Sequence, residues 1–113
     1  MSYKIRIIKF AQIDIRETYK YVADKLQSPV VAAKLVSLID KKIESLKNNP
    51  ERFMLVPDGY LASKGYRVLI VKNHLVFFVV HKDERVVSIM RVLYGRRDWM
   101  NLLKVDVEEE SDS

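Results

Sequence analysis

Residues 66–99, YRVLIVKNHLVFFVVHKDERVVSIMRVLYGRRDW, contain three apolar runs separated by two short polar segments. Runs rich in valine, isoleucine, leucine and phenylalanine are typical of β-strands. Because the connections are short, we expect the strands to be antiparallel neighbours. The run LVFFVV is apolar on both faces, so its strand should lie centrally with cover on both sides. The expected strands are Tyr66–Lys72, Leu75–His81 and Val86–Leu93, with turns at Asn73-His74 and at residues 82–85.

Upstream of this segment, residues 3–10 alternate in polarity and predict a first strand. A first helix is predicted next, with Asp14 as its N-cap and Glu17 in the capping-box position. The second helix should begin after Ser28-Pro29 and end at Asn48-Asn49-Pro50. The apolar stripes of the two helices are formed by Ile15, Tyr19, Val22 and Leu26, and by Ala32, Leu35, Val36, Ile39, Ile43 and Leu46.

The order of these elements predicts an α+β fold: an N-terminal strand, an antiparallel helix hairpin, a three-stranded antiparallel meander and a short C-terminal helix. Residues 50–65 are expected to be a loop, and Asp98–Leu103 the short helix. We expect one domain over residues 1–105. The acidic segment 106–113 has the composition of a disordered tail.

Charge is distributed unevenly along the chain. Its net charge is +5, but residues 106–113 hold five acids and no base. The preceding 105 residues therefore hold 20 bases against 10 acids, a balance that attracts polyanions or an acidic protein partner. The acidic tail could screen this basic body, or it could simply be solvated.

Composition excludes several classes of function. The chain has no cysteine, which excludes disulfides, thiol catalysis and thiolate–metal sites. The two histidines lack the spacing of a metal site, and nothing in the sequence calls for a cofactor. The N-terminal residues have no apolar signal core, and no run reaches the length of about 20 residues that a membrane helix needs. We therefore expect a cytoplasmic protein with no membrane partner.

The chain resembles toxins of the RelE/ParE superfamily, the plasmid-stabilisation family of type II toxin–antitoxin systems, over about residues 4–104. The segment Val92–Trp99, with its Tyr94-Gly95-Arg96-Arg97-Asp98 core, is the most family-like part. The other fragments that carry the resemblance are Ala11-x-x-Asp14-Ile15, Ala32–Leu46, Leu46-x-x-x-Pro50-x-Arg52, Gly65–Leu69, Asn73–Phe78 and Arg91.

This resemblance implies a small cognate antitoxin that wraps and neutralises the toxin. It leaves the target open. RelE-like members are mRNA interferases that cut messenger RNA in the ribosomal A site, whereas ParE-like members inhibit DNA gyrase. Because one fold hosts both activities, the site must distinguish them.

Cleavage of RNA without a metal requires a base, an acid and positive charge against the phosphorane. The candidate catalytic residues are Arg67, Arg91, Arg97 and Tyr94. Arg67 and Arg97 align with functional positions of the RelE-like ribonucleases, and Tyr94 could donate a proton or stack on a base. Equally, Arg67 could form a structural ion pair, the arginines could form a solvated patch, and Tyr94 could anchor the core.

Candidate binding residues surround this set: Lys64, Lys72, Arg96 and His81. His81 could also serve as the proton shuttle. His74 is expected to be an exposed turn residue, and Trp99 to lock the terminal helix onto the core.

Several positions depart from the ribonuclease pattern. Leu69 and Leu75 stand where those enzymes carry positive charge, and Leu102 and Leu103 stand where they carry a tyrosine or histidine. These departures favour a ParE-like toxin that inhibits growth by binding gyrase or a related target. Two alternatives stay open: a ribosome-dependent mRNA endonuclease, and a non-toxic domain that binds nucleic acid or protein.

Overall fold

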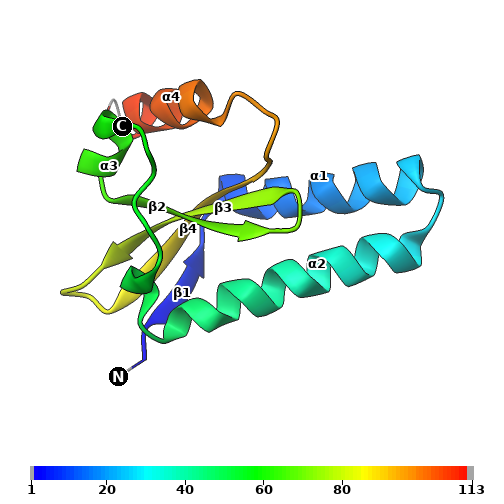
Figure 1. Ribbon diagram of the computed structural model, residues 1–113, viewed down its shortest axis with the longest axis horizontal. Coiled ribbons are helices and arrows are strands. Elements are labelled where there is room, and N and C mark those ends of the chain that lie inside the picture. The colour runs from blue at the N-terminus through cyan, green and yellow to red at the C-terminus, as the bar shows by residue number, and fades with distance from the viewer. Residues whose placement is uncertain (1, 112–113) are drawn as a thin grey trace.

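The computed structural model, which describes residues 2–111, contains a four-stranded sheet with the strand order β1-β4-β3-β2 (Figure 1). The three C-terminal strands form the predicted antiparallel meander, and β1 pairs with β4 in parallel. β3 and β4 are therefore the central strands. The strands are β1 (Lys4–Ile7), β2 (Tyr66–Val71), β3 (His74–His81) and β4 (Val86–Tyr94).

Helices cover both faces of the sheet. The hairpin of α1 (Lys9–Lys25) and α2 (Pro29–Glu44) packs on one face and extends past the end of the sheet (Figure 1). The short helix α3 (Gly59–Ser63) and the terminal helix α4 (Trp99–Ser111) pack on the other face. Two single-turn 3₁₀ helices, Ser45–Lys47 and Pro50–Arg52, lead away from the hairpin. The predicted α+β fold is confirmed.

The middle strand separates two apolar clusters, as its sequence predicts. Val76 and Phe78 belong to the cluster beneath α1 and α2, whereas Phe77 belongs to the cluster beneath α3 and α4. All three side chains are fully buried. Trp99 stacks on Phe77 with a centroid separation of 5.1 Å and so fixes the start of α4, which confirms its predicted role as a lock.

The first strand and first helix differ from the prediction. The strand ends at Ile7, and α1 begins at Lys9 with Ile8 as an N-cap that forms no side-chain bond. Asp14 is thus not a cap. It lies inside α1 and is buried, because its carboxylate is bonded to the sheet. The second helix begins at Pro29 as predicted, and Ser28 caps it by accepting a hydrogen bond from the amide of Val31 at 3.2 Å. It ends at Glu44, earlier than predicted, and a 3₁₀ turn at Ser45–Lys47 follows.

Two loop predictions were wrong in detail. The β2–β3 turn is formed by Lys72 and Asn73, one residue earlier than expected, and Lys72 has a φ of 55°. Residues 50–65 are not a plain loop, since they contain α3. The carboxylate of Asp58 caps this helix by accepting a bond from the Leu61 amide at 2.9 Å.

The acidic segment is not a disordered tail over its described part. α4 continues through it to Ser111, and residues 112–113 lie outside the described residues. Leu103 and Val107, four residues apart, form one apolar stripe against the second cluster. This stripe explains why the helix runs on past Leu103, where composition alone predicted its end.

An irregularity in β4 determines where Arg91 points. Phe77 pairs with Arg91, but the next residue, Phe78, pairs with Ile89, so that one residue of β4 is left over as a bulge. β1 also stops at Ile7, opposite Ile89. Bulges redirect side chains and end regular pairing. Arg91 therefore lies at the edge of the sheet, where it meets α1 on one side and α4 on the other.

Within residues 2–111, no helix combines the length and the apolar character needed to cross a membrane.

Candidate functional site

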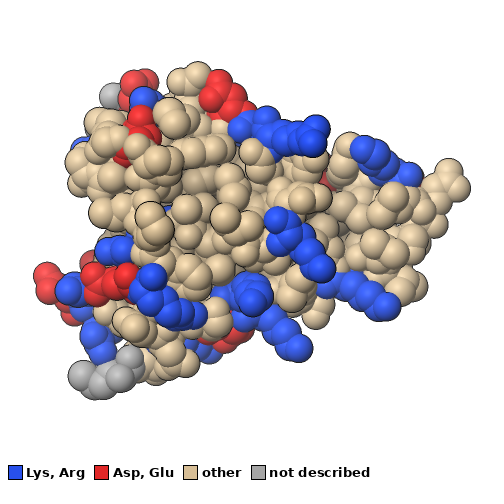
Figure 2. Space-filling model, viewed as in Figure 1, with Lys and Arg blue, Asp and Glu red and all other residues tan. Residues whose placement is uncertain are grey.

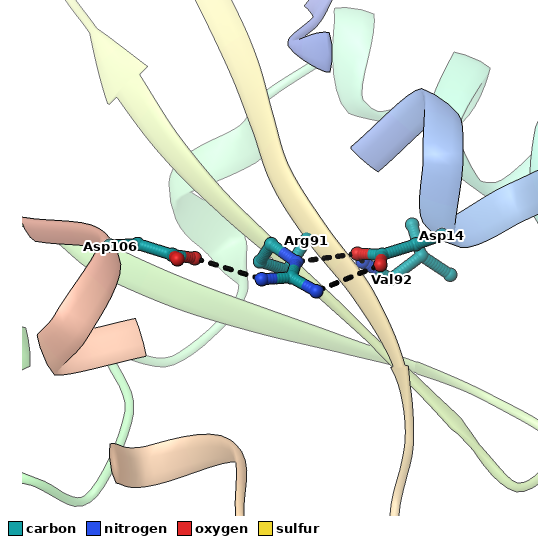
Figure 3. Close-up of polar contacts among 4 residues, drawn as sticks. All are labelled: Asp14, Arg91, Val92 and Asp106. Atoms are coloured by element: carbon teal, nitrogen blue, oxygen red, sulfur yellow. Dashed lines mark hydrogen bonds and ion pairs between the residues drawn. The ribbon is translucent and has the colours of Figure 1, made fainter. Parts of the chain in front are cut away.

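Arg91 is the centre of a buried ion cluster (Figure 3). Its Nε and Nη2 donate to the two carboxylate oxygens of Asp14 at 2.6 and 2.9 Å, and its Nη1 donates to Asp106 at 3.2 Å. Asp14 also accepts the backbone amide of Val92 at 2.9 Å. One carboxylate of α1 thereby satisfies both an arginine and an edge amide of β4, for which β1 offers no partner.

The cluster leaves Arg91 little freedom to bind a ligand. Only 13% of its side chain is exposed, and all three guanidinium nitrogens already donate to carboxylates. The hydrogen bonds that Arg91 donates to Asp14 raise the pKa of Arg91, so the guanidinium stays charged. A paired and buried charge is strongly destabilising once one partner is removed. In this structure Arg91 joins α1, β4 and α4.

Arg67, the second predicted catalytic residue, is also engaged. Its Nη1 donates to the carbonyl oxygens of Phe53 at 2.6 Å and Glu51 at 3.3 Å. Its Nη2 lies 3.6 Å from the Glu51 carboxylate. Arg67 therefore fastens the segment before α3 to β2, an arrangement that corresponds to the structural ion pair considered for it.

A groove opens between the helix hairpin and the end of the sheet. This hairpin groove has a volume of about 960 Å³. Its floor is apolar, and five cations border it: Lys25, Lys34, Lys72, Arg96 and Arg97. Two acids also line it, Glu17 and the Arg91-bonded Asp14. None of the five forms an ion pair within the described part of the chain. Figure 2 shows blue atoms over the hairpin and the free end of the sheet, with little red beside them. The apolar floor residues are Val22, Leu26, Val31, Leu35, Leu38, Val92 and Leu93.

Four of the predicted site residues meet at this groove: Lys72, Tyr94, Arg96 and Arg97. The β4 end is fixed to the β2–β3 turn, because the Gly95 amide donates to the Asn73 carbonyl at 2.8 Å. Glycine suits this close approach, since a Cβ at Gly95 would lie 3.2 Å from the same oxygen, a tight contact. The segment after β4 therefore holds its two arginines beside the turn.

Aromatic side chains line the same groove. Tyr94 contacts the ring of His74 edge-on, with centroids 5.7 Å apart. His74 is half-buried rather than an exposed turn residue, and this burial lowers its pKa and favours the neutral ring. On α1, Lys25 donates to the Tyr21 hydroxyl at 3.1 Å, a bond that raises the pKa of Lys25. The groove wall thus pairs aromatic rings with charges, as binding surfaces commonly do.

His81 and Lys64 lie elsewhere. His81 bonds the Ser88 hydroxyl at 3.1 Å at the opposite end of β3, seven residues from His74, or about 23 Å along an extended strand. Lys64 follows α3 and lies 5.7 Å from the Tyr60 ring on the other face of the sheet. The predicted catalytic and binding residues therefore do not converge on one point.

Sequence reasoning missed the residues on the hairpin side of the groove. Tyr21 and Lys25 are four residues apart on α1, a spacing that places them together on one helix face. Lys34 lies off the apolar stripe of α2, and nothing in its spacing points to a site. Asp14 and Asp106 carried no usable signal, because their partner Arg91 lies 77 and 15 residues away in the chain.

No group of three or more potential metal ligands occurs among the described side chains.

The sequence matches the family described as the ParE toxin of the type II toxin–antitoxin system parDE over residues 5–99. The chain belongs to the ParE toxin family. No curated protein sequence matches it. The family match includes α1, α2, all four strands and the arginine-rich segment after β4.

Two solved structures share the fold of this ParE-family chain. One is the chromosomal ParDE toxin–antitoxin system from P. aeruginosa, with a TM-score of 0.68 at 19% identity, covering 82% of this chain and 96% of that one. The other is the RelBE2 toxin–antitoxin complex from Mycobacterium tuberculosis, with a TM-score of 0.60 at 17% identity, covering 83% and 92%. Likeness at this identity establishes the fold alone.

We predict that Arg91→Lys destabilises the protein by about 1.5–3 kcal/mol, because one ammonium group cannot replace three bonds to two carboxylates. Chemical denaturation measures this loss. Arg97→Lys is the matched control, since Arg97 is exposed and pairs with no acid among residues 2–111; its effect should stay within about 0.5 kcal/mol. Equal effects of the two substitutions would contradict the structural role of Arg91.

Proposed function

We propose that this chain is a ParE-like toxin that acts in the cytoplasm, where it inhibits growth by binding DNA gyrase or a related target and is neutralised by a cognate antitoxin. The observation that carries the proposal is the ParE family match over residues 5–99. The arrangement of the charged residues supports it further.

The positions of the ribonuclease candidates favour binding over RNA cleavage. Transition-state stabilisation requires preorganised charges aimed at one reacting phosphate. Arg67 and Arg91 instead point into contacts with the protein's own carbonyl and carboxylate oxygens. Leu69 stands where the ribonucleases carry positive charge, but it is 5% exposed and belongs to the core. This position therefore supplies no charge to a phosphate. The histidine considered as a proton shuttle, His81, lies at the far end of β3 from Tyr94.

The hairpin groove supports the antitoxin part of the proposal. An apolar floor with a basic border is complementary to an amphipathic helix that carries acids beside its apolar stripe. Tyr21, Leu26, Val31 and Tyr94 expose apolar surface around it. Both similar structures are described as toxin–antitoxin assemblies, which is consistent with such a partner for this chain.

Induced expression of the chain in a bacterium should arrest growth, and co-expression of the small protein encoded beside it should restore growth. The purified chain should inhibit gyrase supercoiling and trap cleaved DNA. Programmed ribosomes incubated with an excess of the chain should show no A-site cuts. A-site cuts with unaffected gyrase would overturn the gyrase proposal in favour of RNA cleavage, and unaffected growth would overturn toxicity.

The double substitution Lys34→Glu/Lys72→Glu should weaken binding of that neighbouring protein by about tenfold or more, equivalent to about 1.4 kcal/mol, because it places acids opposite an acidic partner. Isothermal titration calorimetry measures the affinity. Lys20→Glu/Lys41→Glu is the matched control, with the same charge change at exposed sites outside the groove. Equal losses for both variants would mean that the groove is not the binding site.

A further inference from the structure

The two carboxylates bonded to Arg91 are not equivalent. Asp14 accepts two bonds from the guanidinium and one from the Val92 amide. Asp106 accepts one bond, from Nη1 at 3.2 Å. Both carboxylates are buried, with relative exposures of 8% and 9%. Asp106 is thus desolvated to almost the same degree as Asp14 but has only one of these compensating bonds.

The cluster also carries surplus negative charge, because two carboxylates share one guanidinium. Charged groups face Asp106 from each neighbouring element: Arg91 on β4, Asp14 on α1 and Glu109 on α4 itself. Burial raises the pKa of Asp106, and the charges of Glu109 and Asp14 act in the same direction, while Arg91 opposes them. The charged form of Asp106 is therefore disfavoured when α4 is docked.

The residues around Asp106 add to this penalty. Positions 106, 108, 109 and 110 are all acidic and lie in the last turns of α4. Negative charge is unfavourable at a helix C-terminus, and acids three or four residues apart repel each other. Two contacts oppose this repulsion and hold the last turns against the sheet. Val107 is 6% exposed, and Asp106 accepts one bond from Arg91. Glu108 and Glu109 are exposed.

We propose that residues 106–111 form a releasable strap, which at neutral pH exchanges between a docked state and a state in which the last turns of α4 leave the sheet. Val107 and the Arg91 bond hold the strap down, and the surplus charge of Asp106 favours release. Release uncovers the Nη1 donor of Arg91 while Asp14 keeps that side chain in place. The strap is independent of the proposed gyrase target.

Docking of the strap should depend on pH in one direction. A carboxyl whose pKa is higher in the docked state takes up a proton more readily there than when released. Docking therefore tightens as the pH falls toward that raised pKa, which lies above the ordinary 3.8, and loosens as the pH rises through it. Acid should close the strap rather than open it.

The test is amide hydrogen exchange over residues 106–111 at pH 7, comparing the wild-type chain with Asp106→Asn. The amide oxygen of asparagine can still accept from Arg91, but the surplus charge is gone. We expect exchange in the variant to be severalfold slower. Protection in the wild type should also increase as the pH falls from 7 toward the raised pKa of Asp106, after correction for the intrinsic exchange rate, and the variant should lose this pH dependence.

Glu108→Gln removes the same charge from the same helix at an exposed position, so its effect should be clearly smaller than that of Asp106→Asn. Trimming by a carboxypeptidase gives a second readout and should also slow in Asp106→Asn. Faster or unchanged exchange in Asp106→Asn would overturn the proposal, because the charge of Asp106 would then stabilise docking or have no influence on it. Equal slowing by Glu108→Gln would overturn it as well, by assigning the effect to the helix terminus alone.

Discussion

The bidentate ion pair between Asp14 and Arg91 is the contact on which the arrangement of the layers depends. It joins the first helix to the last strand across 77 residues of sequence. It also satisfies the Val92 amide at a strand edge that β1 leaves open. A buried amide without a hydrogen bond and a buried guanidinium without a counter-ion would each lower the free energy of unfolding. The Asp14 carboxylate avoids both losses. The ion pair also positions one wall of the hairpin groove, because residues 92–94 of β4 form part of that wall.

The sequence predicted the layers well because apolar periodicity is a local signal. The LVFFVV run required cover on both faces, and the helices lie there. The second helix begins at Pro29, where the proline predicted its first turn. Errors arose where a distant contact overrides a local pattern. Aspartate is a residue type typical of helix N-caps, but Asp14 lies inside α1, where it is bonded to Arg91. The acidic segment after Leu103 is helical because Val107 packs on the core.

The candidate site was harder to predict for the same reason. An arginine within a strand is equally compatible with a ligand and with an internal carboxylate, and only the bulge in β4 determines which of these it meets. The cations that do gather in space come from three separate parts of the chain: the helix hairpin, the β2–β3 turn and the segment after β4. No spacing rule in the sequence connects them.

The arginines of this ParE-family chain have two different roles. Arg91 and Arg67 hold the fold together through protein contacts, whereas Arg96 and Arg97 border an open, apolar groove. In the proposed function this chain acts through its surface, and the buried charges shape that surface. The basic border and the acidic last helix lie on different parts of the molecule, so residues 106–111 do not cover the groove (Figure 1).

A double-mutant cycle on Asp14 and Arg91 tests this account most directly. The free energy of unfolding is measured by denaturant titration for the wild type, Asp14→Asn, Arg91→Met and the double variant. The account predicts a coupling energy of about 2–3 kcal/mol, the upper end of the range for contacting residues. A coupling energy near zero would show that Arg91 does not depend on Asp14, and would contradict the structural role on which the rest of the interpretation depends.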